Sequence, residues 1–385
     1  MDISVSAQDL KRALTTCNEI APTSSAVAEE KTGVLIDATE DSVVFSSADD
    51  KLGVRVEVPA EVATPGRALV KANSVAGSVS ATFNDFGFDG DPHRVRLQTT
   101  NKSTLKVSGG NRVAEGRTLN HVRNFPLLNF DFFRGVPEFD TQKSTQFTAI
   151  EFMDGLSKVS HAASRDASKL HLNCIQITLT DNEVVFAATD GIQIAEFRRA
   201  AEVNGLRGSF ILGLKFANIA SKLINPALDF VDLYVDEDQF FLRSGGTVLV
   251  GTLISTQFPD YTPYMEVNGL KLATFPKAEF VDVLQGLQPT VDAKSHRLVV
   301  DARESGYATI STSSVTGEAE SSDLEVQTPE DFTLHFDALL LQNSVRQLKG
   351  EDFEFYFTPE AKGVLLKSQK DDDFRAFVCT LKKVD

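Results

Sequence analysis

The chain has 385 residues, of which 42% are hydrophobic and 24% charged, and its formal net charge is −16 at pH 7. This length allows two or three domains that each bury a core of their own. Apolar runs such as Val248–Ile254 are too short to cross a bilayer, and no secretory leader pattern is present, so we expect a cytoplasmic protein that contacts no membrane.

The chain lacks recognisable catalytic, metal-binding and cofactor motifs. Its cysteines, Cys17, Cys174 and Cys379, lie far apart with no CxxC pair, so neither a disulfide framework nor a zinc site is indicated. Phosphate-loop, metalloprotease and nucleophile-elbow patterns are missing, and the histidines are scattered. We therefore expect a non-catalytic protein without a metal or cofactor. A hidden enzyme site would require clustered carboxylates, which the sequence does not display.

Helices are predicted wherever apolar residues recur at spacings of three, four and seven, because these spacings place side chains on one helix face. Each third of the chain contains two such segments. In chain order, the predicted helices span residues 6–20, 71–83, 149–169, 213–226, 275–287 and 336–350.

Strands are predicted between these helices, in segments that alternate apolar and polar residues and are rich in β-branched and aromatic types. Examples are 95–99, 231–235 and 353–358. The combination predicts an α+β fold, in which two helices per domain pack on one face of antiparallel sheets.

The chain repeats itself at a long period. Two apolar runs joined by a short acidic turn begin at Val34, Ile175 and, more loosely, Leu298, and each copy is followed by an extended segment that leads into a helix. A Phe-Pro dipeptide recurs about 130 residues apart, a period that indicates whole domains and not a solenoid. We predict three repeated domains, 1–131, 132–262 and 263–385, with the aperiodic stretch 129–144 as a linker.

Charge is distributed unevenly along this acidic chain. The predicted helices carry a slight excess of Lys and Arg, whereas the strands and turns are strongly acidic. If all helices face one way, their polar sides form a modestly basic surface suited to loose, salt-sensitive phosphate contact; the alternative is that these are ordinary solvated helix faces. The residues predicted to face DNA are Lys11, Arg12, Lys71, Lys158, Arg165, Lys169, Lys215, Lys222, Arg346 and Lys349.

Two strand regions carry opposite charge. Residues 94–107 contain Arg94, Arg96, Lys102 and Lys106 without an acid, and residues 317–325 contain Glu318, Glu320, Asp323 and Glu325 without a base. Opposite charges on two unpaired sheet edges favour pairing between them, so one chain's head would bind another chain's tail and could close a ring. Chance clustering of surface charge is the alternative.

Several motifs resemble those of the bacterial DNA polymerase sliding clamp, the β subunit of the DNA polymerase III replicase. They are ATDGIQIA from Ala188, FPDYTPY from Phe258, KLHLNC from Lys169, AFVCTLKKV from Ala376 and the Phe-Pro pair at Phe125. We read Thr189-Asp190-Gly191 as a hairpin turn in preference to a metal or acid site, because Asp-Gly suits the backbone angles of such turns.

The resemblance implies a homodimeric ring of six similar domains, with helices lining a hole around double-stranded DNA and sheets forming the outer wall. Such a ring catalyses nothing: it tethers the replicative DNA polymerase during DNA replication and is opened by an ATP-driven clamp loader. Ring closure would pair the strand that holds Leu105 and Val107 with the acidic edge of the third domain in a second copy.

The resemblance also implies a pocket for apolar client peptides between the second and third domains. By motif, its residues are Leu172, Thr189, Gly191, Ile192, Gln193, Ile194, Pro259, Tyr264, Val378, Thr380, Leu381 and Lys382. Family members usually have a basic pair where this chain has Ile192-Gln193, and a Met-Pro-Met type of tail where it has Thr380-Leu381-Lys382. These departures predict an altered client preference and are compatible with a diverged or virally encoded clamp.

A second function fits the acidic composition. The chain could be a scaffold or regulator that has the clamp fold and binds protein partners without encircling DNA. Retention on circular DNA distinguishes the two, because only a ring depends on the circle being closed.

Overall fold

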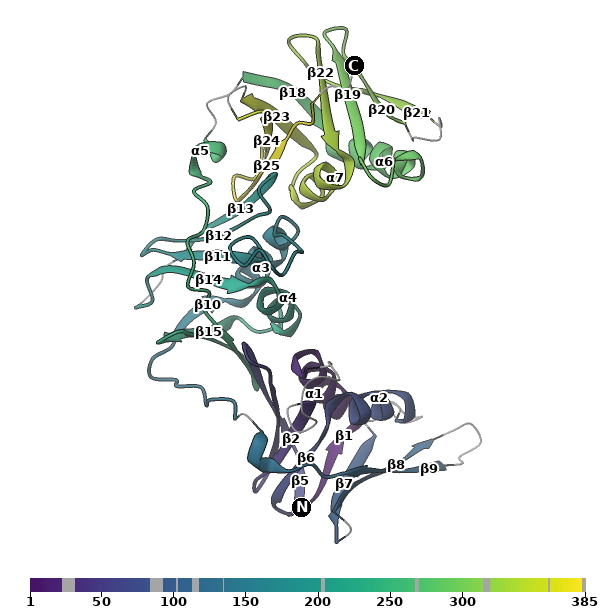
Figure 1. Cartoon of the computed structure of the whole chain (residues 1–385), viewed down its shortest axis with the longest axis vertical. Helices are drawn as coiled ribbons and strands as arrows, with labels where there is room; N and C mark the ends of the chain where they lie inside the picture. Colours follow the sequence, from purple (N-terminus) through teal and green to yellow (C-terminus); the bar gives the residue numbers. More distant parts are fainter. Residues whose placement is uncertain are drawn as a thin grey trace. The chain divides into compact units, whose positions relative to one another are not determined.

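The computed structural model describes residues 1–22, 32–83, 93–101, 103–112, 118–133, 135–201, 205–266, 270–313, 319–358 and 361–382. Within these residues, antiparallel strands form four sheets with a small number of helices, as predicted (Figure 1). The chain divides into two compact units, Met1–Ile150 with Lys222–Thr252, and Glu151–Ser221 with Leu253–Asp385. The three-domain division at 131 and 262 stays a prediction.

The first unit contains a five-stranded and an eight-stranded sheet. The five-stranded sheet has the order β5 (Glu61–Thr64), β1 (Asp2–Ser6), β7 (Arg94–Thr100), β8 (Thr104–Arg112) and β9 (Thr118–Pro126). The eight-stranded sheet has the order β10 (Thr145–Thr148), β15 (Phe230–Asp236), β16 (Gln239–Ser244), β17 (Thr247–Thr252), β4 (Leu52–Pro59), β3 (Ser42–Ala48), β2 (Gly33–Ala38) and β6 (Gly66–Lys71).

Two helices of the first unit, α1 (Ala7–Ile20) and α2 (Ala72–Thr82), pack against each other, and α1 also packs on β3 and β4. The Ser6 hydroxyl caps α1 by accepting a 3.0 Å hydrogen bond from the Asp9 amide, which satisfies one of the open donors of the first turn. Leu10, Leu14 and Cys17 are buried at spacings of four and three, so the apolar stripe predicted from the sequence is the packed face.

The second unit likewise contains one eight-stranded sheet and one smaller sheet. Its eight-stranded sheet has the order β14 (Gly208–Gly213), β11 (Cys174–Leu179), β12 (Glu183–Thr189), β13 (Gln193–Ala200), β25 (Phe374–Cys379), β24 (Gly363–Ser368), β23 (Asp352–Thr358) and β18 (Leu270–Pro276). Its four-stranded sheet has the order β21 (Ala319–Glu325), β20 (Tyr307–Ser313), β19 (Arg297–Arg303) and β22 (Phe332–Asp337).

Helices α6 (Lys277–Leu287) and α7 (Ala338–Gln347) lie side by side, with α6 against β20 and β21 and α7 against β22 (Figure 1). Phe275, Phe280, Phe336, Phe353 and Phe355 are fully buried there, and their rings stack or meet edge to face. This aromatic cluster is the core beneath the two helices.

Helix α3 (Ala149–Ser160) is shorter than the predicted 149–169, and the prediction for its end is wrong. Beyond Ser160 the side chains of Ser164 and Asp166 accept hydrogen bonds from the amides of Asp166 and Ser168, at 3.2 and 3.0 Å. These local bonds offer the backbone an alternative to the helix. Gly155 allows α3 a close approach to the sheet, because a Cβ there would lie 2.3 Å from the Phe186 ring.

The remaining helices are α4 (Leu214–Leu223), which was predicted, and the four-residue α5 (Thr262–Met265), which was not. Short 3-10 turns lie at Phe130–Phe132 and Gln288–Thr290. No helix of the described ranges is long and apolar enough to cross a membrane.

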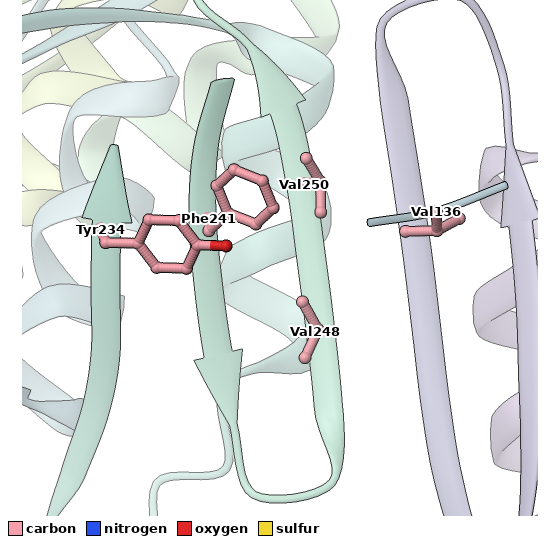
Figure 2. Close-up of a cluster of buried hydrophobic side chains, with 5 residues drawn as sticks. All are labelled: Val136, Tyr234, Phe241, Val248 and Val250. Atoms are coloured by element: carbon pink, nitrogen blue, oxygen red, sulfur yellow. The ribbon is translucent and has the colours of Figure 1, made fainter. Parts of the chain in front are cut away.

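The predicted linker, 129–144, contains no strand in its described residues. It packs against a sheet of the first unit. The Val136 side chain belongs to a buried cluster with Tyr234, Phe241, Val248 and Val250 of β15, β16 and β17 (Figure 2). The rings of Tyr234 and Phe241 stack with centroids 4.2 Å apart. The linker therefore covers this sheet face.

Replacing Val136 with alanine should lower the free energy of unfolding by about 1–3 kcal/mol, because it removes buried methyl groups and leaves a cavity. Urea titration followed by circular dichroism measures this loss. Leu270→Ala is the control, since Leu270 is 71% exposed. Equal stability of Val136→Ala and the unmodified protein would show that the linker adds nothing to the sheet.

Candidate functional site

The loop between β12 and β13 is a tightly bonded hairpin turn, as predicted. The Thr189 hydroxyl donates to the Gln193 carbonyl at 2.6 Å and accepts from the Gly191 amide at 3.1 Å. The Asp190 carboxylate accepts from the amides of Ile192 and Gln193, at 2.9 and 3.0 Å. Gly191 has φ +96°, which favours glycine. These bonds fix the position of every residue in the turn.

A cavity of about 250 Å³ lies beside this turn, within the second unit. Its floor is apolar: Ile194 and Phe377 pack with the buried Met265 and Leu365. Its rim is exposed, since Ile192 is 53% and Tyr264 is 40% accessible. The lining residues are Thr189, Gly191, Ile192, Gln193, Ile194, Pro259, Asp260, Tyr261, Tyr264, Ala361, Phe377 and Cys379.

The structure thus brings together the predicted residues from the β12–β13 turn and the Phe-Pro segment. The predicted residues Leu172, Val378, Thr380, Leu381 and Lys382 do not line the cavity. Leu172 is buried, and Val378 is fully buried where it pairs with Gln193 across β25 and β13.

The predicted residues Thr380, Leu381 and Lys382 form hydrogen bonds with residues of the second unit that do not line the cavity. The Thr380 hydroxyl donates to the Lys362 carbonyl at 3.0 Å, the Leu381 amide donates to the His335 carbonyl at 2.7 Å, and the Lys382 carbonyl accepts from Arg297 at 3.0 Å. These bonds hold the end of β25 in place beside the cavity.

Sequence reasoning missed the lining residues Asp260, Tyr261, Ala361, Phe377 and Cys379. Strand alternation could have found two of them. Successive side chains of a strand point to opposite faces, so Phe377 and Cys379 share the face that Val378 does not.

A buried charge network supports the cavity wall. Glu196 is 1% exposed and accepts hydrogen bonds from Arg198 at 2.9 Å and from Arg375 at 2.5 Å. Burial alone would raise the pKa of Glu196, but the hydrogen bonds from Arg198 and Arg375 hold it below its ordinary value. Burial and a hydrogen bond to Glu196 raise the pKa of Tyr261. Tyr261 therefore stays protonated and is held by the network.

Glu196→Gln should lower the free energy of unfolding by roughly 2 kcal/mol at pH 7, because the buried carboxylate loses its charge-assisted hydrogen bonds to Arg375 and to the half-exposed Arg198. The lowered pKa of Glu196 means that its stabilising contribution is complete above the ordinary Glu pKa and is lost as pH falls through the folded-state value. The gap between variant and parent should therefore narrow as the pH falls below the ordinary Glu pKa of about 4.3. Urea titrations across pH 3–7 measure it, with the exposed Glu40→Gln as control; a gap independent of pH would contradict this account.

The predicted DNA-facing residues differ in accessibility. Arg12, Arg165, Lys169, Lys215, Lys222, Arg346 and Lys349 are exposed, and Lys11 and Lys71 are half-buried. Arg165 and Lys169 lie on the turns after α3 and not on a helix as predicted. Arg12 pairs with Asp9 at 3.2 Å and Lys222 pairs with Glu19 at 3.3 Å.

Lys158 was predicted to face DNA, and this prediction is wrong. Lys158 is only 8% exposed, and its Nζ lies 4.6 Å from the centre of the Phe197 ring. Burial, with the nearby charge of Lys349, lowers the pKa of Lys158. The spacing of residues along α3 does not reveal this burial. The buried face of α3 is wider than its stripe of apolar residues, and it includes Lys158.

The prediction that the basic strand lies at a sheet edge is also wrong. Strand β8, which holds Leu105, Lys106 and Val107, lies between β7 and β9, and Leu105 and Val107 are fully buried. The edge strands of this sheet are β5 and β9, and Leu119 and Val122 of β9 are 54% and 47% exposed.

The predicted cations on β7 are also engaged within the sheet. Arg96 pairs with Asp2 at 2.5 Å and Arg94 with Glu61 at 3.4 Å. Lys102 lies outside the described residues.

The acidic strand β21 does lie at the edge of its sheet, as predicted. Glu320, Asp323 and Glu325 are exposed along it, and Glu318 lies outside the described residues. The Asp323 carboxylate accepts from Thr309 at 2.6 Å. Among the described residues, no group of His, Cys, Asp and Glu side chains is arranged to hold a metal ion.

Comparison with known proteins shows which proteins this chain resembles in sequence and in fold. Residues 147–260 match the family model described as DNA polymerase III beta subunit, central domain. The beta sliding clamp of Treponema pallidum is 21% identical over 88% of both chains, and that of Caulobacter vibrioides is 23% identical over 88% of both.

Solved structures of similar fold cover the whole chain. The DNA polymerase III beta subunit of Thermotoga maritima superimposes with a TM-score of 0.86 at 16% identity, covering 100% of both chains. The beta sliding clamp of Caulobacter crescentus gives 0.86 at 20% identity, covering 100% of this chain and 99% of the other. The chain therefore has the DNA-clamp fold. In sequence it is similar to bacterial beta sliding clamps, and its residues 147–260 match the model of their central domain.

Proposed function

We propose that the protein is a DNA sliding clamp, a ring-shaped processivity factor that encircles duplex DNA and tethers the replicative DNA polymerase. The observation that carries this proposal is the clamp fold along the entire chain, together with the matches to beta sliding clamps. The three modules 1–131, 132–262 and 263–385 would be its repeating units. Such a protein works where the chromosome is copied, in the cytoplasm, and catalyses no reaction itself.

Tethering accounts for processivity without any chemistry by the clamp. A polymerase held by a ring on the same DNA rebinds the primer end as an intramolecular event, so its effective concentration there is high. Sliding requires that the ring's own contacts with phosphate be weak and exchangeable. Exposed cations such as Lys215, Arg346 and Lys349 on an acidic protein meet this requirement.

The ring would be a head-to-tail homodimer closed by β9 of one copy and β21 of the other. Both are free sheet edges within their own units. An acidic edge on β21 and an edge on β9 that offers Arg123, Leu119 and Val122 are complementary, whereas two β21 edges repel each other. A closed ring could not thread onto a circular template unaided, so a loader driven by ATP would open it.

Client proteins would dock through short apolar peptides in the cavity beside the β12–β13 turn. Its apolar floor, its exposed rim at Ile192 and Tyr264, and its few polar groups are those of a preformed peptide site. Leu172, Val378, Thr380, Leu381 and Lys382 would support this site from beneath or beside it.

An acidic scaffold of clamp fold is the second candidate. Burial of Lys158 and pairing of Arg12 and Lys222 reduce the cations available for DNA, which favours this alternative. Retention on closed circular DNA, described at the end of the Discussion, tests the two against each other.

A further inference from the structure

One wall of the peptide cavity is a segment with little backbone structure of its own. Residues 258–261 belong to no helix or strand, and α5 adds only the four residues Thr262–Met265. The residues of this segment that line the cavity are Pro259, Asp260, Tyr261 and Tyr264. A segment with so few internal backbone bonds keeps one shape only if its side chains and its surroundings hold it.

Apolar packing anchors the segment at both ends. Phe258 lies in a buried cluster with Cys174 and Ala187, and Met265 lies in the cluster that forms the cavity floor. Tyr261 packs against both clusters, and its ring meets that of Phe258 edge to face with the centroids 5.9 Å apart. These contacts hold the segment against the sheet, and the remaining fixed points are polar.

The polar anchor is Glu196, which is buried and does not itself line the cavity. Arg375 connects Glu196 to the wall, because its Nη2 donates to the Glu196 carboxylate at 2.5 Å and its Nη1 donates to the Met265 carbonyl at 3.0 Å. The hydrogen bond between Tyr261 and Glu196 is the second connection. One carboxylate thus holds the wall at Tyr261 and, through Arg375, at the end of α5.

The direction of the Glu196 carboxylate is itself fixed by Arg198. The Nε and Nη2 atoms of Arg198 donate to the two carboxylate oxygens, at 2.9 and 3.2 Å. Paired bonds of this kind set the orientation of both groups as well as their separation. Arg198 therefore orients the carboxylate, and Arg375 transmits its position to the wall.

We propose that Glu196 is a positioning residue for client binding: by holding Tyr261 directly and the end of α5 through Arg375, it keeps the cavity formed before a client peptide arrives. This inference rests on the proposed peptide docking and adds the residue that preorganises the site. Without Glu196, the wall would occupy several positions, and only part of the molecules would offer a formed cavity. The apparent affinity would then fall in proportion to the competent fraction.

The inference predicts a kinetic signature that a contact residue does not give. A smaller competent fraction slows association, whereas dissociation is unchanged because no contact with the client is lost. If about a tenth of the Glu196→Gln molecules offer a formed cavity, the association rate constant should fall about tenfold and the dissociation rate constant should change less than about twofold. Gln has nearly the same shape as Glu but only one acceptor oxygen, so it cannot satisfy all the donors that meet Glu196.

Surface plasmon resonance on the full-length protein measures both rate constants. The probe is the replicative polymerase of the same organism, immobilised at low density. Arg375→Lys is a second variant, because a lysine lacks the planar pair of nitrogens that reaches both Glu196 and the Met265 carbonyl; it should slow association to a similar extent. Circular dichroism melts check that both variants are folded at the temperature of the measurement.

The matched control is Glu354→Gln. Glu354 is 4% exposed on β23 of the same eight-stranded sheet, and it accepts hydrogen bonds from Tyr356 and Gln369, both at 2.7 Å. None of these three residues lines the cavity. Glu354→Gln should lose stability as Glu196→Gln does, but both of its rate constants should equal those of the unmodified protein.

A variant of the rim separates this inference from the docking proposal. Ile192→Asp changes the cavity itself and should mainly raise the dissociation rate constant. Unchanged binding by Ile192→Asp, or no binding by the unmodified protein, would contradict docking in this cavity. If docking holds, unchanged association of Glu196→Gln and Arg375→Lys would overturn the role of Glu196 and leave the peptide site standing. Faster dissociation of these variants, or an equal loss in Glu354→Gln, would also overturn it.

Discussion

Reversing the acidic edge, with Glu320→Lys, Asp323→Lys and Glu325→Lys together, should convert the protein from a dimer to a monomer. The three side chains are exposed on β21, an edge strand of its sheet. In the proposed ring they face the β9 edge of a second copy, near Arg123 and Lys106, so the substitutions replace attraction by repulsion. Light scattering coupled to gel filtration should give the mass of one 42.0 kDa chain in place of two.

Two further variants separate a lost interface from a damaged fold. Glu40→Lys, Asp41→Lys and Asp238→Lys change the net charge equally at exposed turns and should leave the dimer intact. Adding Arg123→Glu and Lys106→Glu to the β21 variant should restore part of the dimer by exchanging the charges. A β21 variant that keeps the parent mass would show that the ring, if it forms, closes elsewhere.

Combining Ile192→Asp with Tyr264→Ala should abolish stimulation of primer extension by the replicative polymerase of the same organism. The ring centroids of Tyr264 and Phe377 lie 5.4 Å apart, and Tyr264 and Ile192 are the exposed residues of the cavity rim. Loss of one aromatic anchor weakens a peptide site by roughly 30-fold. A new carboxylate beside Asp190 would further repel an apolar peptide.

The control for this second prediction is Leu270→Asp. Leu270 is the most exposed large apolar residue among those described in the second unit, and it lies on β18 away from the cavity. This variant should stimulate the polymerase normally, and both proteins should keep the dimer mass. Undiminished stimulation by the Ile192 and Tyr264 double variant would remove the peptide function from this cavity.

Local features of this fold were predictable from the sequence. The buried stripe of α1 and the bonded turn at Asp190-Gly191 depend on residues close together in the chain, and patterns at short spacing describe such residues well. The positions of Ile192 and Pro259 in the cavity lining were predicted from the motif resemblance, because family motifs reflect contacts between residues far apart in the chain and periodicity does not.

The errors concern contacts between residues far apart in the chain. Strand β8 has the same alternation whether it lies at an edge or inside a sheet, and only its pairing with both β7 and β9 shows that Leu105 is covered. Lys158 on α3 has a helix-surface spacing but lies against Phe197 of β13, about 40 residues further along the chain. The end of α3 was missed because side-chain bonds at Ser164 and Asp166 outweigh the helical pattern.

Retention on circular DNA tests the central claim most directly. The protein is diluted to separate its subunits, concentrated again in the presence of nicked plasmid, and passed through a gel-filtration column in high salt, which screens ordinary phosphate contacts. A ring should remain with the plasmid and should leave it once a restriction enzyme opens the circle. Equal recovery on circular and linear DNA, or none on either, would contradict encirclement.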